Sequence, residues 1–325
     1  MDMMSEMALS TSHEIELRPT APFHFDGTMH KPSHFPSGGS IWEPGTLWVT
    51  QRMGDDLIGL KLQNAGTVDV PLVRLMIFAD HPLTTDEITA VCDEVADNFD
   101  LYVDLAPFNA ILQRDELMQP VLSRWRGMRI TGSSLYESLI IYIVLQNATV
   151  RRSVQMLDNL FRVYGTLLRF DGQALYSFWS PGVLDAALEE DLRALKVGYR
   201  AKSLKRISSQ FAHGKVDAKA LRRLSSEELK RELLKFYGVG PATAWYLMFE
   251  VFHRYDAFEH VSPWEQRIYS RLLFDEELVP AEQILAEVEE RWGRWKMLAA
   301  HYLFEDLFWR REHEPVPWLE ELIRL

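Results

Sequence analysis

Residues Tyr237–Ala244 read "YGVGPATA", and this short stretch decides the fold. Gly238 and Gly240 permit a sharp turn and leave the main chain open to the close approach of a partner. Pro241 suits the first position of a helix, where its missing N–H costs nothing. The stretch therefore predicts a tight glycine hairpin that leads directly into a helix.

A helix is also expected before the hairpin. Ser225 and Glu228 form a capping box, which predicts one helix from Ser225 to Phe236. The N–H groups at the start of the second helix point outward and carry partial positive charge, an arrangement that binds phosphate. Two interpretations remain open: a backbone clamp on a nucleic-acid phosphate, or a helix–helix turn that needs glycine for geometry alone.

Charge is distributed unevenly along the chain. The net charge of the 325 residues is −12, which by itself argues against a nucleic-acid partner. The segment from Asp191 to Lys235 nevertheless carries thirteen basic and five acidic residues, a local charge of +8. Charge runs are usually solvated helix faces, but this one ends at the glycine hairpin, which favours attraction to a polyanion.

Composition excludes several classes of protein. Cys92 is the only cysteine, so a disulfide framework and a cluster held by four cysteines are both excluded. The longest apolar run, Leu139–Leu145, is too short to cross a bilayer, and the first residues lack the pattern of a signal peptide. We expect a cytoplasmic protein without a membrane partner.

The predicted secondary structure changes from strands to helices near residue 84. Residues 1–12 are expected to form a disordered tail, and residues 13–83 an antiparallel sheet, with "LWVTQRM", "DLIGLKL" and "VPLVRLMIF" as strands. Helical spacing then continues to the end, with Thr84 or Thr85 as one cap and Ser134 with Glu137 as another. The fold class predicted is mainly α with an N-terminal antiparallel β domain (α+β).

Several stretches together resemble the helix–hairpin–helix DNA glycosylases, which remove damaged bases from DNA. "LLKFYGVGPATAWYLM" resembles the hairpin of that superfamily, and "HVSPWEQRIYSRLL" follows where members carry "P-V-D" and then a helix. "GMRITGSSLYESLIIYIVLQNATV" resembles the "G-[LV]-R" strand and the helix whose end enters the duplex. The resemblance extends from about Phe23 to Trp309 and is closest to bacterial 3-methyladenine DNA glycosylase II relatives.

The resemblance implies an architecture of two helical subdomains around a cleft, with the hairpin at its mouth. The helix–hairpin–helix bundle corresponds to residues 131–254. Residues 84–130 and 255–325 correspond to the second helical subdomain, and the N-terminal sheet packs outside both.

The resemblance also implies DNA contacts. The hairpin positions expected to contact DNA are Gly238, Val239, Gly240 and Ala242. Asn147 matches the residue that fills the gap left by a flipped base, with Gln146 as its substitute; alternatively, Asn147 is a helix C-cap. Arg152 matches an arginine that contacts the opposite strand.

A pocket for the flipped base is expected to be aromatic, because stacking holds a base well. By the resemblance, Tyr246 matches an aromatic pocket position, Phe304 and Trp309 lie near others on the C-terminal helix, and Trp264 is also expected at the base pocket. Aromatic residues at helical spacing are more often part of the core, so both interpretations stay open for these four residues.

Glu265 stands where the superfamily carries its catalytic aspartate. A carboxylate there stabilises the positive charge that develops on the sugar as the base leaves. Alternatively, Glu265 is a first-turn helix acid, and Asp256 and Glu259 are then the substitutes. Bifunctional members carry a nucleophilic lysine at the position of Ala242, so no lyase step is expected.

No cofactor is expected to be required, and an iron–sulfur cluster is excluded by the single cysteine. By analogy, the backbone carbonyls of Leu234, Phe236 and Val239 are the expected donors to a monovalent cation. His24, His30 and His34 are interpreted as surface histidines.

The sequence therefore predicts a monomeric, nucleoid-associated, monofunctional DNA glycosylase. It would hydrolyse the N-glycosidic bond of flipped-out, alkylated purines in double-stranded DNA. Two alternatives are an oxidised-purine glycosylase, because "GYRAK" and Arg152 resemble that branch, and a lesion-binding protein without catalysis, because Glu265 replaces the usual aspartate.

Overall fold

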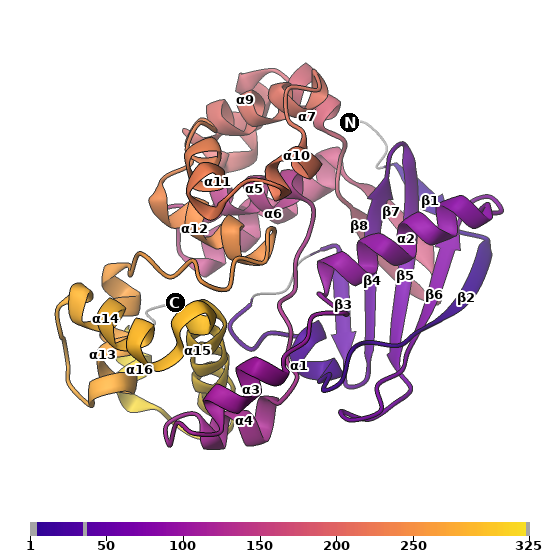
Figure 1. Ribbon diagram of the computed structural model, residues 1–325. Helices are drawn as coiled ribbons and strands as arrows, with labels where there is room; N and C mark the ends of the chain where they lie inside the picture. Colours follow the sequence, from indigo (N-terminus) through magenta and orange to yellow (C-terminus); the bar gives the residue numbers. More distant parts are fainter. Residues whose placement is uncertain (1–4, 35–37, 323–325) are drawn as a thin grey trace.

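The computed structural model describes residues 5–34 and 38–322 (Figure 1). Its strands are β1 (Glu6–Ala8), β2 (Thr11–Leu17), β3 (Ser40–Glu43), β4 (Thr46–Met53), β5 (Asp56–Asn64), β6 (Val73–Ala79), β7 (Thr166–Phe170) and β8 (Gln173–Ser177). Its α-helices are α1 (Phe25–Met29), α2 (Thr85–Asn98), α3 (Ala106–Leu112), α4 (Gln119–Trp125), α5 (Leu135–Leu145), α6 (Val150–Tyr164), α7 (Pro181–Ala186), α8 (Glu189–Leu192), α9 (Arg200–Ala212), α10 (Ala218–Arg222), α11 (Ser226–Leu233), α12 (Pro241–Glu250), α13 (Pro263–Phe274), α14 (Ala281–Trp292), α15 (Lys296–His313) and α16 (Pro317–Leu322), with short turns η1 (Arg193–Val197) and η2 (Gly293–Trp295). The predicted α+β class is confirmed.

The larger sheet is antiparallel throughout, in the order β2-β6-β5-β4-β3. Its strands β4, β5 and β6 are the three runs that the sequence predicted. Helix α2 covers one face, where Val91 and Val95 join the core formed by Leu60, Leu62 and Leu75. Helix α2 therefore packs on the sheet, because the apolar face of the sheet binds its apolar side chains. This corrects the prediction that residues 84–130 all belong to the second helical subdomain.

A second, three-stranded sheet was not expected. Its order is β1-β7-β8, with β1 parallel to β7 and β8 antiparallel to β7. Residues 5–12, predicted as part of a disordered tail, form β1 and the start of β2, while residues 1–4 lie outside the described residues. Strands β7 and β8 also correct the prediction that the chain is helical throughout after residue 84.

The two sheets pack against each other through an apolar contact. Leu168 and Phe170 of the small sheet join Trp48 and Leu57 of the large one in a shared buried cluster. Asp171, in the β7–β8 turn, accepts a hydrogen bond from the Trp48 indole at 2.7 Å. The same carboxylate forms an ion pair with Lys61 at 2.8 Å. Segments separated by more than one hundred residues are thereby joined in a pair of packed sheets.

The helices form two groups beside these sheets (Figure 1). One group contains α5 to α12, with α5 nearly fully buried through Leu139, Ile140, Ile143 and Val144. The other contains α13 to α16, with α3 and α4 beside α15. The exact subdomain boundaries stay a prediction, apart from the changed position of α2.

Two local predictions differ from the structure. Residues 127–130 form no strand: Gly127 turns at φ +90, and the Arg129 N–H donates to Thr28 Oγ1 at 3.0 Å. Helix α11 ends at Leu233, three residues before the predicted end at Phe236. The capping boxes at Thr84 and Ser225 are both present, and Ser134 accepts from the Glu137 N–H.

No helix in the described ranges is both long and apolar enough to cross a bilayer.

A glycine in β5 decides how closely the two sheets approach. A Cβ at Gly59 would lie 2.6 Å from the Phe170 ring, so Gly59→Ala is expected to lower the free energy of unfolding by about 1–3 kcal/mol. Gly182→Ala is the matched control, because a Cβ there meets open space and alanine favours a helix. Urea unfolding would test this contrast, and equal stability of both variants would contradict it.

Candidate nucleic-acid interface and active site

The glycine hairpin joins α11 to α12, as predicted. Gly238 has φ +90, and a Cβ there would lie 2.7 Å from Ser203 Oγ and 3.1 Å from Ile143 Cδ1. Two independent reasons therefore require glycine: the backbone conformation and the close packing of the turn against α5 and α9.

Gly240 has a different role. It is the N-cap of α12 with φ −100, a conformation open to any residue, and a Cβ there would meet nothing within 4 Å. Pro241 occupies the first turn, and no side chain caps it. The free start of a ten-residue helix with an unobstructed approach can accept an anion from outside.

Gln146 connects the end of α5 to the hairpin. Its side-chain amide donates to the Gly238 carbonyl at 2.8 Å and to Thr243 Oγ1 at 3.1 Å. The Arg200 guanidinium donates in turn to the Gln146 carbonyl. Gln146 thus holds the hairpin against α5, and a direct contact between Gln146 and DNA stays a prediction.

Asn147 is exposed and adopts the left-handed conformation at φ 49, two residues after α5 ends. That backbone geometry fits a residue that terminates a helix. Its amide donates to the Tyr199 hydroxyl at 3.4 Å, and Tyr199 is 58% exposed. The side chain is therefore available to a partner, while its role in filling a gap stays a prediction.

Arg152 lies in the first turn of α6 and is exposed. Its guanidinium donates to the Lys196 carbonyl at 2.5 Å and to Gln155 Oε1 at 3.0 Å. A contact of Arg152 with a second DNA strand, which also stays a prediction, would have to replace or share these bonds.

Part of the basic segment is neutralised within the protein. Arg193, Arg222, Lys230 and Lys235 form ion pairs with acidic side chains. Other cations gather beside the hairpin: the Arg206 guanidinium lies 4.2 Å and the Lys202 ammonium 5.5 Å from the centre of the Tyr237 ring. The positive charge at the hairpin is thus concentrated in fewer residues than the sequence count suggested.

Sequence reasoning missed Tyr199 and Tyr237 as surface residues. Both rings are largely exposed, Tyr237 to 41%, and both lie under arginine side chains. The signal was present in "GYR" and "FYG", where a tyrosine adjoins a glycine turn and basic residues.

Glu265 is buried, with 5% of its surface exposed. It is the third residue of α13 and completes a capping box: Oε2 accepts from the Ser262 N–H at 3.0 Å, and its own N–H donates to Ser262 Oγ at 3.3 Å. Oε1 accepts a hydrogen bond from the Tyr246 hydroxyl. The structure thus gives Glu265 the first-turn position of the alternative interpretation and also points its carboxylate at Tyr246 on the hairpin helix.

Tyr246 belongs to a row of alternating tyrosines and carboxylates. Its ring lies parallel to Tyr142, with centroids 5.6 Å apart and planes 15° apart. Tyr142 on α5 donates to Glu250 Oε2 on α12. Burial, followed by the neighbouring carboxylates, raises the pKa of both tyrosines well above the ordinary value, so both hydroxyls keep their protons as donors.

A buried charged cluster adjoins this row. Burial raises the pKa of Glu250, against the opposing charges of His34 and Lys31. Burial likewise lowers the pKa of Lys31 to about 7, opposed by Glu305 and Glu250. The N-terminal segment after α1 therefore meets α12 and α15 through ionisable groups.

The predicted pocket residues do not form one group. Trp264 packs edge-on against Phe304, with centroids 5.7 Å apart, in an apolar cluster between α13 and α15. Trp309 instead packs against Trp125, and the Arg124 guanidinium lies over its ring. Only Tyr246 lies with the carboxylates, and the pocket role of all four residues stays a prediction.

Two of the three histidines, His24 and His30, are not simple surface residues, which corrects that interpretation, whereas His34 is exposed as predicted. His24 caps α1 by accepting from the Gly27 N–H at 2.9 Å, and His30 stacks on Trp42 at 4.2 Å. Burial lowers the pKa of both imidazoles. Their polar atoms serve local structure, which their spacing could not reveal.

The predicted ion site is defined by backbone atoms. The Phe236 carbonyl accepts from the Val239 N–H at 3.0 Å within the hairpin, and Leu234 is the C-cap of α11. These carbonyls lie in the turn, and a monovalent cation there stays a prediction.

The known proteins that this chain resembles in sequence are named as DNA glycosylases. No family model matches the chain. A probable N-glycosylase/DNA lyase of Methanothermobacter thermautotrophicus is 27% identical over 221 residues, which is 62% of this chain and 68% of that protein. A DNA-3-methyladenine glycosylase of Bacillus subtilis is 22% identical over 215 residues, covering 65% and 70%.

Solved structures show the same fold. The 3-methyladenine DNA glycosylase of Archaeoglobus fulgidus superposes with a TM-score of 0.76 at 18% identity, covering 93% of this chain and all of that one. The 8-oxoguanine glycosylase/lyase of Clostridium acetobutylicum gives 0.68 at 23% identity, covering 92% and 99%. The resemblance to the helix–hairpin–helix DNA glycosylase superfamily is confirmed.

The open start of α12 generates a prediction. Gly240→Asp is expected to fold normally, because aspartate is a favourable N-cap, yet to reduce duplex binding steeply, because it places a negative charge where a phosphate would lie. Fluorescence anisotropy with a labelled duplex would measure this, and wild-type affinity should fall linearly with log salt.

Gly240→Ala is the neutral control for that variant, because its Cβ meets open space. Binding by Gly240→Asp at the wild-type level, or affinity that ignores salt, would show that DNA does not approach this helix start.

Proposed function

We propose that this protein is a monofunctional DNA glycosylase of base excision repair that hydrolyses the N-glycosidic bond of alkylated purines. The observation that carries the proposal is the position of the Glu265 carboxylate. This carboxylate is buried and accepts a hydrogen bond from Tyr246. Tyr246 lies on α12, six residues after Gly240 at the open start of that helix. The proposed phosphate contact and a fixed carboxylate would thereby lie on adjoining elements. The relatives named as glycosylases support the same reaction class.

Double-stranded DNA with a damaged base is the proposed partner. The helix start at Gly240 and the cations around Tyr237 would hold the backbone. Asn147, exposed at the neighbouring end of α5, would occupy the space left by the extruded nucleotide. The protein would act as a cytoplasmic monomer associated with the nucleoid.

Glu265 is the proposed catalytic residue. Two hydrogen bonds fix its carboxylate before substrate arrives, and a preorganised negative charge stabilises the cationic sugar of the transition state at little further cost. Tyr246 and Ser262 are positioning residues in this proposal.

The tyrosine–carboxylate row favours a cationic substrate. Purines alkylated at N3 or N7 carry positive charge, whereas oxidised purines are neutral. The faces of Tyr142 and Tyr246 attract a cation, and Glu250 and Glu265 lie at their hydroxyls. An oxidised purine, the alternative substrate, gains nothing from these carboxylates, although one neighbour in structure is named for 8-oxoguanine.

A second candidate function is lesion binding without excision. It is favoured by one observation: both Glu265 oxygens already have partners, and the residue completes a capping box. A carboxylate retained for helix capping alone would leave the hairpin and Asn147 to bind damaged DNA without chemistry.

Glu265→Gln separates these two functions. Glutamine also completes a capping box, so the variant should fold and bind lesion duplexes normally. Base release should fall by on the order of a hundredfold or more, because the negative charge is lost. The assay is single-turnover release of 3-methyladenine, 7-methylguanine and 8-oxoguanine from defined duplexes, followed by chromatography.

Excision at the wild-type rate by Glu265→Gln would exclude Glu265 as the catalyst. If the wild type releases none of these bases but still prefers lesion duplexes, the protein is a binder. Preferential release of 8-oxoguanine would support the alternative substrate class.

Strand cleavage is not expected to follow base removal. Ala242 offers no amine, and the nearby Lys235 is paired with Glu232 at 2.6 Å. Borohydride treatment with abasic duplex should leave the wild type untrapped, whereas Ala242→Lys supplies a possible nucleophile and tests whether the site can form a Schiff base. A wild-type adduct mapped to one lysine would contradict this, and the relatives named as lyases make the assay informative.

A further inference from the structure

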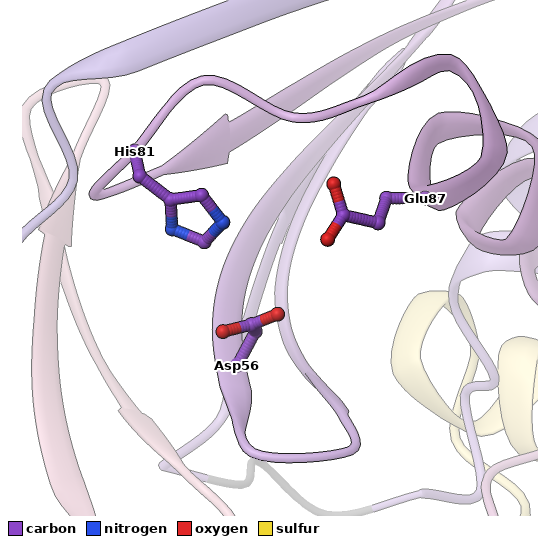
Figure 2. Close-up of side chains that lie close together, drawn as sticks. All are labelled: Asp56, His81 and Glu87. Carbon is purple, nitrogen blue, oxygen red and sulfur yellow. The ribbon is translucent and has the colours of Figure 1, made fainter.

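A cluster of metal-ligand side chains lies on the sheet domain, on elements that the proposed DNA site does not use (Figures 1 and 2). Asp56 begins β5, His81 follows β6, and Glu87 lies in the first turn of α2. One ligand atom from each side chain lies within 4.8 Å of the other two. Figure 2 shows the three side chains directed into one shared space.

Two of the three ligands are fixed from outside the cluster. Glu87 Oε2 accepts from the Thr84 N–H and hydroxyl, each at 2.7 Å, which leaves Oε1 unused by the capping box. His81 Nδ1 is bonded to Asp80 Oδ1 at 2.7 Å. With Nδ1 as the donor, Nε2 keeps its lone pair for a metal, and the carboxylate–histidine pair has the outer-shell arrangement that orients metal-bound imidazoles.

Asp56 supplies the third ligand. Its backbone pairs with Met53 at the close of the β4–β5 hairpin, which fixes its Cα. Within residues 5–34 and 38–322, the Asp56 carboxylate has no hydrogen bond or ion pair with another side chain.

We propose that Asp56, His81 and Glu87 form a zinc site with water in the remaining position. One imidazole and two carboxylates suit a borderline divalent ion such as Zn²⁺, whereas Ca²⁺ and Mg²⁺ take oxygen ligands. Ligand atoms on tetrahedral zinc lie roughly 3.3 Å apart. The three side chains are partly exposed and can close inward by that small amount.

A bound ion would join the β4–β5 turn, the β6–α2 loop and the first turn of α2. It would therefore stabilise the sheet domain by an amount that grows with the logarithm of the free zinc concentration above the dissociation constant. Without metal, the same three groups are an imidazole beside two carboxylates.

Titration calorimetry of the chelator-treated full chain with zinc chloride tests the proposal. The expected result is one equivalent bound, with affinity reduced at least about tenfold in His81→Ala and in Asp56→Asn. Asp55→Asn is the matched control, because it removes an adjacent exposed carboxylate outside the cluster and should bind like the wild type. Cobalt substitution should add visible absorption that both ligand variants lose.

The proposal is overturned if the wild type binds no zinc, or if His81→Ala and Asp56→Asn bind as tightly as Asp55→Asn. Circular dichroism of each variant separates ligand loss from misfolding. Should His81→Ala misfold, Asp56→Asn with the cobalt spectrum decides alone.

Discussion

The contact between the hairpin turn and the two helices behind it is the constraint on which the proposed site depends. The backbone at Gly238 lies so close to Ser203 and Ile143 that no side chain fits, and Gln146 fixes its carbonyl. Helix α12 starts three residues later, at Pro241, so this single contact sets the direction of the helix start. Tyr246 and Glu250 occupy the same helix and inherit that position. A displaced turn would therefore move the phosphate contact and the tyrosine–carboxylate row together.

A second constraint holds the N-terminal domain to the C-terminal helices. Lys31, 2% exposed, donates to the carbonyls of Gly27 and Arg129, and Ser33 donates to Glu305 through both its N–H and its hydroxyl. Burial of an ammonium and a carboxylate costs several kcal/mol each unless both are hydrogen-bonded. Because these groups lie on different domains, the cost is offset only when the domains are correctly docked. The network thus favours one relative placement of the sheet and α15.

Local chemistry explains which parts of the fold could be predicted. The hairpin, the caps at Thr84 and Ser225 and the start of α12 at Pro241 depend on neighbours in sequence, and each was recognisable. The pairing of β1 with β7 joins residues about 160 apart, and no local pattern encodes such a contact. The β7–β8 turn did carry a signal: Asp171 and Gly172 form an Asp-Gly pair, which is typical of two-residue hairpin turns, and both have the positive φ that such a turn requires. The surrounding helical spacing concealed it.

The site itself was less predictable, because tertiary contacts decide what each side chain does. Glu265, Tyr246 and Trp264 were all identifiable, yet sequence could not show that Glu265 faces Tyr246 while Trp264 packs with Phe304. Tyr142 and Glu250 escaped notice because their apolar helices suggested a plain core. The hydrogen bond between the Tyr142 hydroxyl and the Glu250 carboxylate forms only when α5 and α12 lie side by side.

The two roles of Glu265 are physically compatible. A capping box holds the third residue of a helix by two hydrogen bonds, and its carboxylate lies at the positive end of the helix dipole. These are also the conditions for a preorganised charge, which stabilises a transition state because it need not reorient. A shorter aspartate at the same Cα would reach Ser262 and Tyr246 less easily, since both bonds use the full length of the glutamate. The longer side chain at this position therefore follows from where its partners lie, whether or not it also carries the chemistry.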